Sequence, residues 1–341
     1  MHRRAFTRTL AAAALAATLV AAAGCDDSGD SAKAGGQSLE KVTYLTSFGT
    51  FGRDAYAYVA KEKGYFADAG FDVDIKPGGG TGENLKIVTA GQAQFAPIDL
   101  TGLLLSAGSG QASNFVAVSG IQQRTMAAII TLEGNGITSP KDLEGKTLAD
   151  SPASVVRNLF PTYAKLANID ASKVTWQNGT PQTLMGTLAA GKAAGIGQFV
   201  VGKPTVESIA KKTAVVLPYS DYLQDLYGNV LLTSQSYAKA HPDRVKAFTG
   251  ALLKGLGDAI ANPDEAAQLL KKYVPTTNPQ AAAAELTLMG PFVKSEASGV
   301  PVGALDSQRV ARSIAILQGS GQIKPGLTPE QVIDFSLVPK A

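Results

Sequence analysis

Strand-like runs alternate with helical stretches along most of this 341-residue chain, and this alternation constrains its fold more than any other feature. Runs of β-branched and aromatic residues separated by helical segments of about 10–15 residues indicate βαβ units. The pattern therefore predicts an α/β protein with mostly parallel sheets. The strand candidates are 41–46, 72–75, 95–98, 115–119, 127–131, 147–149, 174–177, 196–200, 214–217 and 230–233, and the helix candidates between them are 53–63, 83–90, 153–166, 182–190 and 205–211.

The chain becomes helical after Thr233. Asn262-Pro263, Asn278-Pro279 and Thr328-Pro329 each place a capping residue before a proline, which suits the first position of a helix because the missing N–H has no partner there. Apolar residues recur at three- and four-residue spacing between Val245 and Ile260, as in a helix packed on a core. We therefore expect a helical C-terminal region.

The first 24 residues have the pattern of a secretory signal. Arg3, Arg4 and Arg8 precede an alanine-rich apolar run that is shorter than the ~20 residues of a membrane span. The run ends at Ala22-Ala23-Gly24-Cys25, which resembles a bacterial lipobox although leucine is more usual at the place of Ala22. We expect residues 1–24 to be removed, Cys25 to be lipidated and residues 25–38 to form a flexible tether to the membrane.

The folded part then begins at about Leu39, and its length favours two domains at ~150 residues each. The whole chain carries 31 Lys+Arg against 28 Asp+Glu, and removal of the three signal arginines makes the remainder formally neutral. No basic stripe predicts nucleic-acid binding.

Residues that could carry catalysis or bind a metal are scarce. Outside the signal, the sequence has one histidine, His241, and one cysteine, Cys25. A zinc site usually needs three or four ligands, most of them histidine or cysteine. The glycine run 78–82 matches neither a phosphate-binding P-loop nor a dinucleotide fingerprint. The sequence therefore predicts no metal, no cofactor and no enzymatic activity.

Five motifs in order resemble one transport family. They are Ala60-Lys61-Glu62-Lys63-Gly64-Tyr65-Phe66, Gly91-Gln92-Ala93-Gln94-Phe95, Ser139-Pro140-Lys141-Asp142-Leu143-Glu144-Gly145-Lys146, Leu188-Ala189-Ala190-Gly191-Lys192, and the stretch from His241-Pro242 to Asn262-Pro263. These segments look like substrate-binding proteins of ABC importers for nitrate, sulfonates, taurine and the thiamine pyrimidine precursor.

The resemblance implies a type II periplasmic-binding-protein fold. One lobe would contain residues 39–123 and 229–341, and the other residues 124–228. The implied partners are a small molecule held between the lobes and the permease of an importer, and the implied protein is an extracytoplasmic monomer.

Four loops, and the point where the chain first crosses from one lobe to the other, should face the crevice between the lobes. Ligands of open α/β sheets bind in such crevices. Several of these residues could equally be helix caps or packing residues between the lobes. The ligand-binding candidates are Phe48, Phe51 and Arg53 after the first strand, Asp99 and Thr101 after the third, Arg124 at the crossing, Ser151 and Ser154 at a helix start, and Asn178, Phe199 and Tyr227 in the fourth group.

These candidates are aromatic and polar more than cationic, which favours a pyrimidine-like or other flat heterocyclic ligand. A sulfonate or nitrate remains the alternative, because the helix start at Ser154 also suits an oxyanion. Two other functions stay open on the same fold. One is an extracellular sensor module, and the other is an enzyme like the thiamine-pyrimidine synthase, whose cysteine-rich motif and histidine are missing from this sequence.

Overall fold

The computed structural model describes residues 39–110, 113–295 and 299–340. The expected signal peptide, Cys25 and the tether up to residue 38 lie outside the described residues. Residues 38–341 form one compact unit. Within the described residues, no helix is both long enough and apolar enough to cross a membrane.

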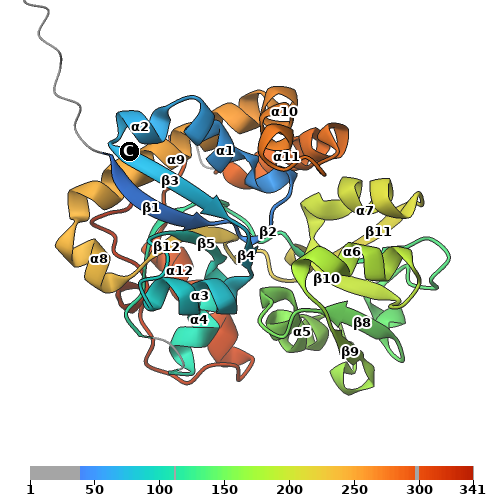
Figure 1. Cartoon of the computed structure of the whole chain (residues 1–341). Coiled ribbons are helices and arrows are strands. Elements are labelled where there is room, and N and C mark those ends of the chain that lie inside the picture. Colours follow the sequence, from blue (N-terminus) through green and yellow to red (C-terminus); the bar gives the residue numbers. More distant parts are fainter. Residues whose placement is uncertain (1–38, 111–112, 296–298, 341) are drawn as a thin grey trace, which may run out of the picture. The chain divides into compact units, whose positions relative to one another are not determined.

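Strands between residues 40 and 120, together with one later strand, build the first group of sheets (Figure 1). β1 (Glu40–Leu45) pairs in parallel with β3 (Phe71–Lys76), and two α-helices lie between them in the sequence. β12 (Asn229–Thr233) lies antiparallel between β5 (Ala96–Asp99) and β6 (Val116–Gly120). An isolated bridge between Tyr44 and Phe95 joins the two groups of strands. The returning strand β12 thus places a segment from late in the sequence beside the N-terminal strands.

The second sheet has five strands, all from residues 127 to 218, in the order β11-β7-β10-β8-β9. Its pairs are parallel where a helix connects the strands, and β7 runs antiparallel to both of its neighbours. The α/β class is confirmed, with mixed sheets. The strands are β7 (Ala127–Leu132), β8 (Thr147–Asp150), β9 (Thr175–Asn178), β10 (Gly195–Phe199) and β11 (Ala214–Pro218).

Helices cover these sheets, and the expected helical C-terminal region is confirmed (Figure 1). Gly255 allows α9 (Pro242–Ala261) to lie directly on α1 (Ala55–Glu62), because a Cβ there would be 2.5 Å from the carbonyl oxygen of Tyr56. The helices are α1 (Ala55–Glu62), α2 (Tyr65–Asp68), α3 (Thr81–Thr89), α4 (Leu100–Gly108), α5 (Val155–Leu166), α6 (Pro181–Ala189), α7 (Lys203–Ala210), α8 (Gln235–Ala240), α9 (Pro242–Ala261), α10 (Pro263–Tyr273), α11 (Pro279–Val293) and α12 (Ser307–Gly319).

An aromatic cluster centred on Phe248 of α9 forms the core over the first sheets. Its ring stacks on Phe95 with centroids 3.9 Å apart and on Phe66 at 5.0 Å. Phe71 and Tyr44 approach the same ring at 5.5 Å and 6.1 Å. One buried side chain therefore connects strands β1, β3 and the start of β5 to the C-terminal helices.

Replacement of Phe248 by alanine should lower the free energy of unfolding by about 3–5 kcal/mol, because a large cavity would open in this cluster. Urea unfolding followed by circular dichroism measures the effect. The control is Leu288→Ala on α11, where the side chain is 40% exposed, and its effect should stay within about 0.5 kcal/mol. Equal losses in both variants would contradict the central role of Phe248.

Candidate functional site

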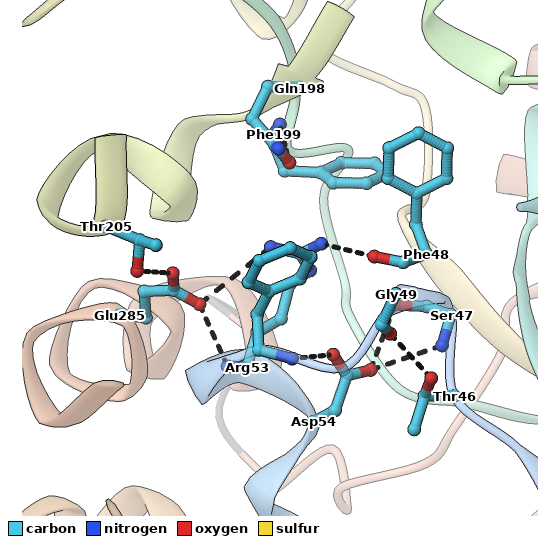
Figure 2. Close-up of polar contacts among 11 residues, drawn as sticks. Thr46, Ser47, Phe48, Gly49, Arg53, Asp54, Gln198, Phe199, Thr205 and Glu285 are labelled. Atoms are coloured by element: carbon cyan, nitrogen blue, oxygen red, sulfur yellow. Dashed lines mark hydrogen bonds and ion pairs between the residues drawn. The ribbon is translucent and has the colours of Figure 1, made fainter. Parts of the chain in front are cut away.

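Segments at the strand ends of the first group of sheets meet segments at the strand ends of the second sheet. We call this meeting place, formed around Phe48, Arg53 and Phe199, the junction. Phe48 follows β1, Phe199 ends β10, and their rings pack edge to face with centroids 6.0 Å apart (Figure 2). Beside them, the amide of Gly82 donates a hydrogen bond of 3.2 Å to the carbonyl of Ala153. Both phenyl rings are buried, so side chains fill the junction in this structure.

A short two-strand ribbon positions Phe48. β2 (Phe48–Gly49) pairs with β4 (Gly78–Gly79) directly before α3. The ribbon needs glycine at position 78, because a Cβ there would lie 2.0 Å from the carbonyl oxygen of Thr46. The glycine run therefore makes a close backbone contact that presents Phe48 to the second sheet.

Arg53 is buried at the junction with incomplete hydrogen bonding. Its Nη2 donates to the carbonyl of Phe48 at 2.9 Å, while Nε and Nη1 have no hydrogen-bond partner among the described residues. The guanidinium lies 4.7 Å from the ring centroid of Phe51 and 5.1 Å from that of Phe199. It is therefore held between two aromatic faces, an arrangement that stabilises a cation.

Glu285 of α11 is the buried counter-charge of Arg53. Its Oε2 accepts a hydrogen bond of 3.1 Å from the backbone amide of Arg53 and lies 3.8 Å from Nη1. Its Oε1 accepts from the hydroxyl of Thr205 on α7 (Figure 2). Burial raises the pKa of this carboxyl, and the Arg53 charge acts in the opposite direction. One carboxylate thus bonds to elements on both sides of the junction.

Asp54 and Asp99 are two further buried acids. Asp54 accepts hydrogen bonds from the amide and hydroxyl of Ser47 and from the amide of Phe51, and burial raises its pKa. Asp99 caps α4 by accepting from the amide of Thr101 at 2.8 Å. Burial raises the pKa of Asp99 to about 6.

Asp150 ends β8 and lies against Gly197 of β10. A Cβ on Gly197 would be 1.9 Å from Asp150 Oδ2, so the glycine makes room for this carboxylate. Oδ1 accepts from the amide of Ser151, and Oδ2 has no hydrogen-bond partner among the described residues. Burial raises the pKa of Asp150 to about 7, and the neighbouring Ser154 hydroxyl and Arg157 act to lower it.

The charge balance of the junction follows from these side chains. Within the described ranges, the buried charged residues are Arg53, Asp54, Asp99, Asp150 and Glu285. Glu285 contacts Arg53 directly, Asp54 follows Arg53 in the chain, and Asp99 and Asp150 lie where strands β5 and β8 end. Four acids and one base are therefore buried among the described residues, where charges interact strongly because water is excluded.

Four of the residues predicted from the sequence come together at the junction, namely Phe48, Phe51, Arg53 and Phe199. Ser151 and Ser154 are buried at the start of α5, where Ser154 caps the helix by accepting from the amide of Val156. Asp99 and Thr101 are buried at the start of α4.

The other three candidates contact groups outside this set. Arg124 donates to the carbonyl of Pro291 and lies over the ring of Phe292. Asn178 is exposed and accepts a hydrogen bond from Arg157. Tyr227 is buried, and its hydroxyl accepts from the amide of Asp306 at 3.0 Å. The structure therefore assigns each of these three side chains a contact within the protein.

The sequence did not single out Glu285, Thr205 or Gln198. Gln198 is buried, its Oε1 accepts from the amide of Phe199, and its Nε2 has no partner among the described residues. For Glu285 a signal existed, because it is the only charged residue in the apolar helix Pro279–Val293. For Thr205 and Gln198 we see no pattern in the sequence that would have identified them.

An α/β protein in which the strand ends of two groups of sheets meet at such a junction has the fold of periplasmic binding proteins. The alkanesulfonate-binding protein SsuA of Xanthomonas axonopodis pv. citri is similar, with a TM-score of 0.69 and 15% identity over 88% of this chain and 100% of that one. The nitrate-binding protein NrtA of Synechocystis PCC 6803 is similar with a TM-score of 0.67 and 12% identity, over 88% of this chain and 87% of that one.

The chain belongs to the NMT1/THI5-like family, whose model matches residues 54–266. It is 26% identical over 322 residues to the riboflavin-binding protein RibY of Chloroflexus aurantiacus, covering 89% of this chain and 87% of the relative. It is 23% identical over 236 residues to the formylaminopyrimidine-binding protein of Halalkalibacterium halodurans, covering 69% and 71%. The family resemblance derived from the sequence motifs is thereby confirmed.

Glu285→Gln should lower the free energy of unfolding by about 3 kcal/mol, because the charge of Arg53 would remain buried without its counter-charge. In a double-mutant cycle, Arg53→Met combined with Glu285→Gln should cost less than the sum of the single changes. Chemical denaturation measures all variants. Glu265→Gln is the control, since that side chain is 52% exposed, and strictly additive effects would show that the two charges do not depend on each other.

Proposed function

We propose that the protein is the extracytoplasmic substrate-binding component of an ABC importer and that it binds a flat nitrogen heterocycle at the junction. Membership of the NMT1/THI5-like family supports this function. The two curated relatives named above are a riboflavin-binding and a formylaminopyrimidine-binding protein, and both names refer to flat heterocyclic compounds. The protein would hold its ligand without changing it chemically, act as a monomer and deliver the ligand to a permease.

The charge balance of the junction is the observation that carries the choice of ligand. A sulfonate or nitrate would need an excess of cations and free N–H donors, whereas four of the five buried charged groups are acids. The start of α5, a suitable place for an oxyanion, already lies beside the carboxylate of Asp150. The aromatic rings of Phe48, Phe51 and Phe199 provide apolar faces for a ring instead.

Binding would require opening and closing of the junction. We assign residues 39–123 and 229–341 to one lobe and 124–228 to the other, in keeping with the strands that each sheet contains. Since Phe48 and Phe199 touch in this structure, a ligand enters only when the lobes separate. Such hinge motion around a ligand is common in periplasmic binding proteins.

Two alternatives share this fold. A sensor module would bind the same ligand without an importer, and a permease gene beside this one would favour transport. An enzyme like the thiamine-pyrimidine synthase gains no support from the described residues, because no three potential ligands of a metal gather there and His241 lies between α8 and α9.

A thermal-shift screen should show stabilisation by heterocycles and none by oxyanions. The probes are riboflavin, 4-aminopyrimidine and cytosine on one side and taurine, methanesulfonate and nitrate on the other. A bound heterocycle at 100 times its Kd should add about 2.7 kcal/mol to stability, and small-angle scattering should show a more compact particle. Phe51→Ala should weaken binding by about 1–3 kcal/mol through loss of an aromatic contact.

Phe335→Ala serves as the matched control, because Phe335 is also half-buried but follows the last short helix, away from the junction. Stabilisation by an oxyanion alone, with affinity that falls steeply as salt is added, would instead favour the sulfonate and nitrate alternative. Chemical conversion of a bound probe by the purified protein would contradict the binding function.

We also propose that Cys25 is lipidated and holds the protein at the membrane surface. The small residues before it and the absence of a second cysteine in the sequence support this anchor. Cys25→Ser should therefore move the protein from the membrane fraction to the soluble fraction, as seen after fractionation of the expressing cells. A Cys25→Ser protein that stays with the membrane would rule out this anchor.

A further inference from the structure

Three side chains at the junction have buried polar atoms without a hydrogen-bond partner among the described residues. They are Arg53 with Nε and Nη1, Asp150 with Oδ2, and Gln198 with Nε2. Buried polar groups in proteins are almost always paired, and an unpaired one costs about 1–3 kcal/mol. Two of them, Arg53 and Asp150, approach Phe199 and Gly197, which are alternate residues of β10, so one shared partner would satisfy both.

Arg53 offers donors to this partner, in surroundings that do not require an anion. Its positive charge is already balanced by Glu285, which lies 3.8 Å from Nη1. Asp54, the next residue, is a second buried acid beside it. The N–H groups of Arg53 are therefore suited to an uncharged acceptor such as a ring nitrogen or a carbonyl oxygen.

Asp150 offers an acceptor from the other side of the junction. Its carboxylate lies against Gly197, and the loop that follows it contacts Gly82 through the carbonyl of Ala153. The Ser154 hydroxyl and the Ser151 amide already act on this carboxylate, and Oδ2 can accept a further hydrogen bond because an ionised carboxylate only accepts. An amino group or a ring N–H on a ligand would donate this bond.

Strand β10 links the two groups. Asp150 lies against Gly197, and the guanidinium of Arg53 faces the ring of Phe199, two residues further along the strand. Alternate residues of a strand share one face, so both groups approach the same side of β10. The rings of Phe48 and Phe199 occupy the space beside this stretch, where a substituted six-membered ring could replace their contact.

We propose that Arg53 and Asp150 recognise opposite edges of the ligand, so that the protein selects an uncharged heterocycle bearing both an N–H donor and a carbonyl or ring-nitrogen acceptor. This inference rests on the proposed function, and it narrows the ligand to amino-substituted or amide-containing rings. Asp150 and Arg53 are then specificity-determining residues from the two sides of the junction.

The test compares cytosine, which has an amino N–H donor, with unsubstituted pyrimidine, which has ring-nitrogen acceptors but no N–H donor. Asp150→Asn preserves the shape of the side chain but removes the charge of the acceptor. We expect this variant to bind cytosine ten- to hundredfold more weakly in isothermal titration calorimetry and to bind pyrimidine as the wild type does. Arg53→Lys should weaken the binding of both compounds, because both present a ring-nitrogen acceptor and lysine cannot place N–H groups where Nε and Nη1 lie.

The pH profile provides a readout that a purely structural role would not change. Burial raises the pKa of Asp150 to about 7, so its ionised form is lost as the pH falls through 7. Cytosine binding to the wild type should therefore weaken between pH 8 and pH 6, while Asp150→Asn should show a flatter profile. The groups facing Asp150 are Arg157 and Tyr219, and burial raises the pKa of the Tyr219 phenol well above its usual value, out of that range.

Asp99, with a pKa of about 6, also titrates there, and the Asp150→Asn profile isolates its contribution. Asp170→Asn is the matched control on the same side, because Asp170 is an exposed capping residue of a short helix. Circular dichroism confirms that each variant is folded.

The outcomes separate the two proposals. If none of the heterocycles binds the wild type, the proposed function fails. If heterocycles bind and compact the protein but Asp150→Asn and Arg53→Lys retain wild-type affinity for cytosine, the proposed function stands and the assignment of these two residues is wrong.

Discussion

The guanidinium of Arg53 is buried away from water, so its positive charge needs other groups to stabilise it. The arrangement of the segments around it depends on this requirement. The aromatic faces of Phe51 and Phe199 supply one part, and the carboxylate of Glu285 supplies another. Glu285 belongs to α11, so the C-terminal helices are needed to complete a site that begins just after the first strand. The return of the chain through β12 is what brings these distant segments together.

The acids around Arg53 show how one fold can serve different ligands. Helix starts that meet in a crevice favour anions through their free N–H groups and dipoles. In this chain, carboxylates lie at two helix starts. Asp99 caps α4, and Asp150 lies beside Ser154, the residue that caps α5. Under the proposed function, a change of a few side chains at strand ends would therefore alter the preferred ligand charge while the sheets stay the same.

The sequence predicted the regular elements well because hydrophobic periodicity determines them locally. All ten expected strands are present within one or two residues of their predicted ends. Helix α4 (Leu100–Gly108) was missed, since its run of leucines and glycines has no clear polar face. The two-residue strands β2 and β4 were also missed, because their pairing depends on the close approach of Gly78 to Thr46. At the site, the pairing of Arg53 with Glu285 joins positions 232 apart, which no local pattern reveals.

Helix α11 bonds to α7 at two points, through Glu285 to Thr205 and through Asn278 to Ser208. Both bonds join a C-terminal helix to a helix beside the second sheet, so under the proposed function they would favour the closed arrangement with or without a ligand. A change that weakens them would then raise the population of open molecules, and the apparent affinity would fall with the closed fraction. A substitution on α11 would in this way tune ligand capture with every residue that touches the ligand kept constant.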